Sequence, residues 1–310
     1  MPKQAFSSFE AFFDANRHAS LRAMVLGPVR ENWVLNHLVL NNLSVQWGQA
    51  ESKALVEGAP RAGGVSIFMP TRSASAWWGN GRRFDELSLL VALPGDDFCL
   101  VADTPRSWCS LYIPNGELAG PNGDVTTAVG SSRGFFQVPS QRMERFRSVI
   151  GQLDEAVQVA PAAFDSAARQ KASAQKLVRE IRNVLAMPHE VEPKLGRHEV
   201  PRKQIIRMAM DFVDQHEAEY LSLEQLAAAA AVSERTLRDA FHWCFGIPPV
   251  QYLNRRTLHQ VRRALKSADP SKATVASIAT RFGVWQFGRM ARDYRLLFGE
   301  LPSETLRNRY

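Results

Sequence analysis

Two stretches of the sequence carry polar side chains of the kind that can recognise DNA bases. Arginine has a forked guanidinium that matches the O6 and N7 acceptors of guanine, and glutamine can pair with adenine. These side chains could contact base edges if each set lies on the free face of a helix. The candidate residues are Arg235, Thr236, Arg238 and Asp239 in the first stretch, and Gln286, Arg289 and Arg292 in the second.

The two stretches repeat one frame of apolar and turn residues at an offset of 53 positions. Each has apolar side chains on one face of an expected helix, and a helix of small residues precedes it. Ala227 and Ala279 are small enough for two helices to cross closely. The pattern predicts two helix-turn-helix units. The aligned pairs are Leu237 and Met290, Phe241 and Tyr294, Phe245 and Phe298, Gly246 and Gly299, and Pro249 and Pro302.

Charge changes sign where the first copy begins. Residues 199–234 hold seven acidic and three basic side chains, a net charge of −4, whereas residues 235–310 hold fourteen basic and five acidic ones, a net charge of +9. A basic excess confined to one segment favours a polyanionic partner. The alternative for a single such helix is an ordinary solvated face, and the second copy makes this alternative much weaker.

A long helix is predicted between the copies, over PPVQYLNRRTLHQVRRALKSA. About eighteen residues at about 1.5 Å each span roughly 27 Å. With the turns added, this approaches the spacing of about 34 Å between successive major grooves on one DNA face. Basic residues here could contact phosphates, although some could instead form ion pairs within the protein. The predicted backbone contacts are Arg255, Arg256, Arg262, Arg263, Lys266 and Arg295.

Residues 205–309 resemble the C-terminal DNA-binding domain of the AraC/XylS family of bacterial transcription regulators. The resemblance rests on VSERTLRDAFHWCFGIPPVQYLNRRTLHQVRRAL and FGVWQFGRMARDYRLLFGELPSETL, which are most similar to the ethanolamine-utilisation operon regulator branch. In the second unit, VWQFG stands where the family commonly has a serine. Because of this difference, Trp285, Phe287 and Gly288 could lie either in the core or on the DNA-facing surface.

The N-terminal half has a different pattern. Short alternating runs between Leu21 and Ile113 predict an all-β sandwich or barrel. Helical spacing from Ser140 to Met187 predicts helices broken near Pro161. The resemblance implies an effector-binding or dimerising module, often a cupin-like β-barrel followed by helices. We therefore expect a two-domain α+β protein. Its predicted parts are a cupin-like sensor domain over 1–139, a helical segment that could dimerise over 140–187, a linker over 188–201 and the DNA-binding domain over 202–310.

Candidate effector-binding residues in this half are Trp33, His37, Trp47 and Trp77. Aromatic core packing is the commoner explanation for any one of these tryptophans. His37 is the only histidine of the predicted strand region, and a metal-dependent enzyme would need several converging ligands. We expect no metal, cofactor or catalytic residue. A cupin-type enzyme with an accessory nucleic-acid-binding domain stays open, as does a DNA-binding module whose N-terminal half only dimerises.

Composition bounds the remaining possibilities. No apolar run is long enough to span a membrane, and no secretory signal is visible, so a cytoplasmic protein is expected. The three cysteines are expected to be buried thiols. The expected partners are a double-stranded DNA operator and a small-molecule effector, with a second copy of the chain and RNA polymerase as further candidates.

Overall fold

The computed structural model describes residues 3–30, 32–71, 77–79, 82–102, 106–118, 134–186, 202–216 and 220–308. The chain divides into two compact units. The N-terminal unit comprises Met1–Ala23, Arg30–Glu51 and Val56–Lys194, and the C-terminal unit comprises Met24–Val29, Ser52–Leu55 and Leu195–Tyr310. A β-rich N-terminal part and a helical C-terminal part confirm the expected two-domain α+β organisation. The predicted linker, 188–201, lies outside the described residues.

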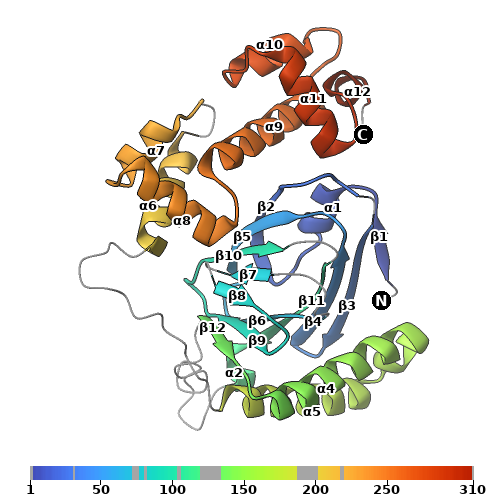
Figure 1. The fold of residues 1–310 in the computed structure, drawn as a ribbon. Coiled ribbons are helices and arrows are strands. Elements are labelled where there is room, and N and C mark those ends of the chain that lie inside the picture. Colours follow the sequence, from blue (N-terminus) through green and yellow to red (C-terminus); the bar gives the residue numbers. More distant parts are fainter. Residues whose placement is uncertain are drawn as a thin grey trace. The chain divides into compact units, whose positions relative to one another are not determined.

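Two sheets form most of the N-terminal unit (Figure 1). The larger has the strand order β1 (Gln4–Phe6), β3 (Trp33–Leu40), β4 (Leu43–Ala50), β11 (Arg106–Pro114), β6 (Gly64–Pro70), β9 (Ser88–Ala92) and β12 (Gly134–Gln137). The smaller has the order β2 (Ala19–Val25), β5 (Ala54–Pro60), β10 (Phe98–Ala102), β7 (Trp77–Gly79) and β8 (Arg82–Phe84). Among the described strands, this order gives two open sheets and no closed barrel, so the cupin-like barrel stays a prediction.

Local sequence explains the hairpin of β3 and β4. Asn41 and Asn42 form the connection, and Asn41 adopts a positive φ of 56°, which asparagine tolerates better than most residues. The two strands then pair in antiparallel register, with Leu40 opposite Leu43 and Asn36 opposite Trp47. Because side chains alternate between the faces of a strand, this register decides which residues meet the helices.

Two long helices, α4 (Ser140–Val159) and α5 (Ala167–Leu185), cover one face of the larger sheet (Figure 1). The 3-10 turn η1 (Pro161–Asp165) separates them, which confirms the predicted break near Pro161. Side chains from β3, β4, β6, β9 and β11 pack with both helices in one apolar core. Two shorter helices, α1 (Phe9–Asp14) and α2 (Asn115–Leu118), also belong to the described part of the unit, and the Ser8 side chain caps α1 by accepting from the N–H of Ala11.

This packing removes the sequence argument for a dimer interface on α4 and α5. A dimer interface over 140–187 would need apolar residues that one chain leaves exposed, and the candidates in these helices are Phe146, Ile150, Leu177 and Ile181. All four are at most 2% exposed and belong to the core beneath the sheet. The apolar face of the larger sheet packs against both helices, so a second chain is not required to bury these residues.

The C-terminal unit is helical. Its helices are α6 (Arg202–Gln215), α7 (Leu223–Ala229), α8 (Glu234–Phe245), α9 (Pro249–Ser267), α10 (Val275–Arg281), α11 (Phe287–Phe298) and α12 (Pro302–Arg307). Figure 1 shows α8 and α11 at opposite ends of the long helix α9. Among the described helices of the whole chain, none is both long and apolar enough to span a membrane.

Candidate nucleic-acid interface

The first helix-turn-helix consists of α7 and α8. Ser222 and Gln225 form a reciprocal capping box at the start of α7, and the Ser233 side chain accepts from the backbone N–H of Thr236 at the start of α8. Leu226 and Leu237 are fully buried, as are Phe241 and Phe245 farther along α8. The capped ends and the buried face fix α8 against α7, which leaves the opposite face of α8 free.

The predicted base-contacting residues of α8 all lie on that free face. Arg235, Thr236, Arg238 and Asp239 are exposed. Arg238 forms an ion pair with Glu234, one turn earlier, with a nitrogen–oxygen distance of 2.7 Å. Exposed pairs of this kind contribute little to stability, so the guanidinium can exchange Glu234 for another acceptor at low cost.

The second helix-turn-helix consists of α10 and α11. Thr274 and Ser277 form a capping box at the start of α10, in the same place as the capping box of α7. Met290, Tyr294 and Phe298 are buried as predicted. Gln286, Arg289 and Arg292 are exposed. The structure therefore places both predicted sets on the outer faces of equivalent helices.

The two recognition helices begin differently. Gln286 occupies the N-cap position of α11 but makes no side-chain capping bond, whereas Ser233 caps α8. Trp285 is 71% exposed and Phe287 is 38% exposed. Gly288 is also exposed. Of the two places that the sequence left open for these residues, the structure thus favours the surface.

Two of the predicted phosphate contacts make hydrogen bonds or ion pairs within the domain. Arg256 donates hydrogen bonds through Nη2 to the backbone oxygens of Val213 (3.0 Å) and His216 (2.9 Å), which ties α9 to the end of α6. Arg262 is 8% exposed and forms an ion pair with Glu300, so it is not available to a phosphate. The physical reason is that α9 contacts helices on several sides, and few of its faces reach solvent.

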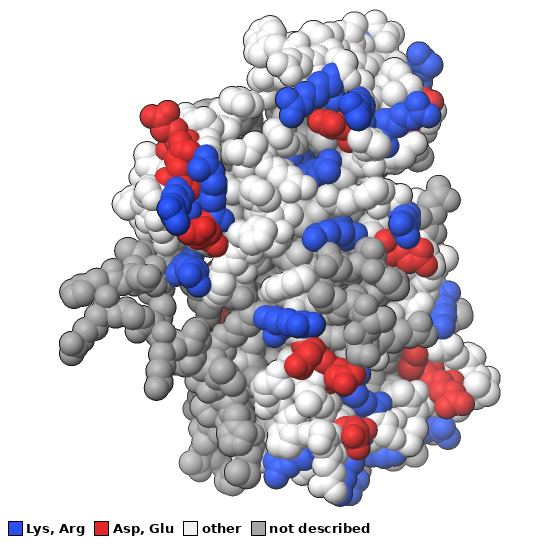
Figure 2. Space-filling view, viewed as in Figure 1, with Lys and Arg blue, Asp and Glu red and all other residues white. Residues whose placement is uncertain are grey.

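The other predicted backbone contacts keep some access to solvent. Arg263 and Arg295 are exposed, and Lys266 is partly exposed. Arg255 is half-buried, its Nε atom has no hydrogen-bond partner in the described part of the chain, and burial lowers the pKa of its guanidinium. In Figure 2, the charged side chains visible over α10, α11 and α12 are mostly Lys and Arg, set among uncharged residues. A basic surface of this kind suits a phosphate backbone.

Of the four predicted effector-binding residues, two are packed among other aromatic rings. The Trp33 ring lies 5.2 Å from that of Phe12, and the Trp77 ring lies 5.2 Å from that of Phe68 (centroid distances). Trp33 is 1% exposed and Trp77 is 3% exposed. This is the core packing that the sequence analysis considered the commoner explanation.

The other two, His37 and Trp47, point to opposite faces of the larger sheet. Trp47 packs in the core with α4 and α5, beside Asn36, whose Nδ2 donates to Asp154 of α4 at 2.9 Å. His37 follows Asn36 along β3, so its side chain points away from these helices. The structure therefore does not bring the four predicted residues into one pocket.

A buried polar cluster that the sequence did not reveal lies around His18. Its Nδ1 is 2.8 Å from Ser110 Oγ, and its Nε2 is 2.8 Å from Ser44 Oγ. Burial, together with nearby His37 and Arg61, lowers the pKa of His18 to about 3, and burial with Arg17 lowers that of His37 to about 4. The neutral ring can donate from one nitrogen and accept at the other, which suits two serine hydroxyls. No local signal in the sequence relates these distant residues.

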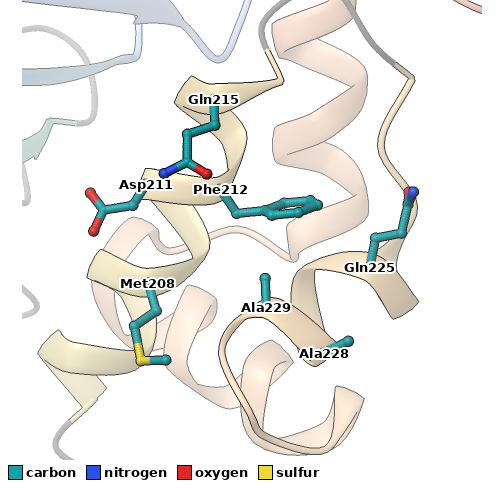
Figure 3. Close-up of a pocket in the computed structure, with 7 residues that line it drawn as sticks. All are labelled: Met208, Asp211, Phe212, Gln215, Gln225, Ala228 and Ala229. Atoms are coloured by element: carbon teal, nitrogen blue, oxygen red, sulfur yellow. The ribbon is translucent and has the colours of Figure 1, made fainter.

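An open groove of about 520 Å³ lies between α6 and α7. Figure 3 shows the Phe212 ring extending from α6 toward α7, with Asp211 pointing the other way. The groove contains none of the predicted DNA-contacting residues. Its lining consists of Met208, Asp211, Phe212, Gln215, Gln225, Ala228 and Ala229.

Metal chemistry has no visible basis in the described residues. Within these ranges, no group of three or more His, Cys, Asp or Glu side chains is placed to hold an ion. Cys109 and Cys244 are buried as expected, whereas Cys99 is partly exposed, and all three are free thiols.

Comparison with known proteins agrees with this geometry. Residues 226–308 match the family described as "Helix-turn-helix domain". The chain is 32% identical over 124 residues to the probable thc operon regulatory protein of Rhodococcus erythropolis, covering 40% of this chain and 37% of that protein. It is 36% identical over 98 residues to the XylDLEGF operon transcriptional activator of Pseudomonas putida, covering 32% and 30%. The matches thus span about a third of these curated relatives.

Two solved structures are also similar. One is a probable AraC family transcriptional regulator from Rhodopseudomonas palustris CGA009, with 31% identity, 34% of this chain and 98% of that chain covered, and a TM-score of 0.31. The other is the AraC-like transcriptional activator CuxR, with 13% identity, 84% and 89% coverage, and a TM-score of 0.41.

The C-terminal unit contains a helix-turn-helix domain with two helix pairs, α7 with α8 and α10 with α11, and the second helix of each pair has an exposed face. Over its matched residues, this domain is similar in sequence to the two operon regulators named above.

Proposed function

We propose that this protein is a sequence-specific DNA-binding transcription regulator that contacts one duplex through both helix-turn-helix units. One observation carries the proposal. The helices α8 and α11 occupy equivalent positions in two repeated units, at opposite ends of α9, and each exposes polar side chains on its outer face. The 19 residues of α9 span about 28 Å at about 1.5 Å each. With the flanking turns, this suits two successive major grooves on one face of DNA.

The proposed division of labour follows from residue chemistry. Arg235, Arg238, Arg289 and Arg292 suit guanine, and Gln286 suits adenine. Thr236 and Asp239 complete the exposed face of α8. The proposed phosphate contacts are Arg255, Arg263, Lys266 and Arg295, because Arg256 and Arg262 are engaged within the domain.

For the N-terminal unit, we propose a cupin-like sensor of a small-molecule effector. The family resemblance supports this role. The four predicted pocket residues do not, because they do not meet in one pocket. Thermal unfolding with a ligand panel tests this role, because an effector that binds the native state must raise the melting temperature. Homodimerisation, contact with RNA polymerase and closeness to the ethanolamine-utilisation branch remain predictions.

Selection of bound sequences from random duplex DNA by the full-length protein tests DNA recognition. We expect an enriched motif with two contacted segments about one helical turn apart. Arg238→Ala and Arg292→Ala should each weaken binding to the enriched DNA by about 1–3 kcal/mol. Arg179→Ala, an exposed arginine of α5, is the matched control and should have no effect. A selection that enriches no motif would contradict the proposal. If the two arginine variants lose equal affinity for enriched and random DNA, the arginines contact phosphates and not bases.

A further inference from the structure

Two aromatic side chains, one just before α11 and one at its first residue, are exposed to solvent. Trp285 is 71% exposed and Phe287 is 38% exposed. The other two aromatic residues of α11 face the core: Tyr294 is fully buried and Phe298 is 7% exposed. Neighbouring exposed apolar groups on a soluble domain commonly mark a binding surface.

Gly288 gives a second, independent observation at the same place. It lies in the first turn of α11, and a Cβ atom added there would meet nothing within 4 Å. Its φ is not among the positive values, so neither space nor backbone conformation requires glycine. Glycine in a helix is about 1 kcal/mol less favourable than alanine. A residue without a side chain at an exposed position allows another surface to approach the backbone closely.

The surroundings indicate what that surface is. Arg281, Arg289 and Arg292, which lie within seven positions of the aromatic pair in sequence, are all exposed. The occupant must therefore combine negative charge with apolar groups. The major groove of DNA does so, because phosphates flank it and each thymine presents a C5-methyl group there.

Resting on the proposed function, we infer that Trp285 and Phe287 are specificity-determining residues that contact thymine methyl groups in the major groove. Gln286, which lies between them and makes no capping bond, faces adenine in the same segment. The first unit has Glu234 and Arg235 after its capping Ser233 and lacks an aromatic pair there. The two units therefore recognise different DNA chemistry: α11 an A·T-containing segment, and α8 a more polar one.

Replacing thymine with deoxyuridine tests this inference, since it removes only the methyl group. Each thymine of the selected motif is replaced in turn, and the affinity of the full-length protein is measured. We expect a loss of about three- to five-fold at one or more thymines, the factor that follows from one buried CH₂-sized group. Trp285→Ala and Phe287→Ala should bind the thymine and deoxyuridine sites equally well. Gly288→Ala should weaken binding without lowering thermal stability.

Leu296→Ala is the matched control, because Leu296 is 59% exposed on the same helix but near its other end. It should keep the full preference for thymine. If deoxyuridine has no effect at any position while the motif is still recognised, the inference is wrong and the proposed function stands. A preference for thymine that survives in both aromatic variants also overturns it. Failure to enrich any motif contradicts the proposed function itself, and this inference with it.

Discussion

Gly246 and Gly299 end α8 and α11 with the same left-handed backbone, at φ values of 66° and 78°. The N–H of Gly246 donates to the oxygen of His242 (3.0 Å), and that of Gly299 to the oxygen of Arg295 (2.9 Å). Each glycine thus closes its recognition helix in the same way. The repeat extends from apolar spacing to backbone geometry, which supports equivalent roles for the two helices.

Replacing Gly299 with alanine should lower the free energy of unfolding by about 1–2 kcal/mol, because an L-residue is disfavoured in the left-handed region. Open space surrounds the added Cβ atom, so the cost comes from the backbone. Gly288→Ala in the same helix is the control and should leave stability unchanged or slightly raised. Urea unfolding measures both variants. Equal stability of Gly299→Ala and wild type would show that the end of α11 tolerates another conformation.

The sequence predicted the helix-turn-helix units because their apolar spacing, caps and glycines act locally. It did not predict the roles of Arg256 and Arg262, since helical periodicity does not reveal how many neighbours surround a helix. Nor could it show that His37 and Trp47 lie on opposite faces of the sheet, because this depends on the register of β3 and β4. The His18 cluster joins segments far apart in sequence, so only the folded sheet reveals it.

The adjacent arginines 262 and 263 should behave differently. Arg262→Ala should destabilise the protein by about 3 kcal/mol, because Glu300 would be left without its cation in a mostly buried position. Arg263→Ala should leave stability within about 0.5 kcal/mol of wild type. It should weaken binding to all DNA sequences alike and reduce the salt dependence by about one phosphate contact.

Unfolding curves and DNA titrations at several salt concentrations distinguish the two arginines. A stable Arg262→Ala protein with reduced DNA affinity would restore Arg262 as a phosphate contact. An unchanged salt dependence in Arg263→Ala would remove Arg263 from the interface.

The buried histidine pair should make stability depend on pH. His18 has a folded-state pKa of about 3, below the unfolded value of 6.5, so the unfolded chain binds the proton first as the pH falls. The stabilising effect of a neutral His18 is therefore complete above about pH 6.5 and is lost progressively toward pH 3. The slope for one proton is at most about 1.4 kcal/mol per pH unit.

Between pH 6 and 4, the free energy of unfolding of His18→Gln should depend less steeply on pH than that of wild type. The difference in slope should correspond to about one proton taken up on unfolding. Subtracting the two curves removes the contribution of the carboxyl groups, which both proteins share. An NMR titration of the folded wild-type protein gives an independent check, in which the His18 ring should stay neutral at pH 5. A ring that protonates near pH 6.5 would show that the cluster is open to solvent.

The most direct test of the account combines DNA spacing with one substitution. Binding is measured on the selected motif, with and without five base pairs inserted between its two contacted segments, for wild type and Arg292→Ala. A half-turn insertion moves one segment to the opposite face of the duplex. If one chain binds both segments, the insertion should weaken wild-type binding at least about ten-fold and abolish the effect of Arg292→Ala. Unchanged affinity, with the full effect of Arg292→Ala retained, would contradict simultaneous binding by the two units.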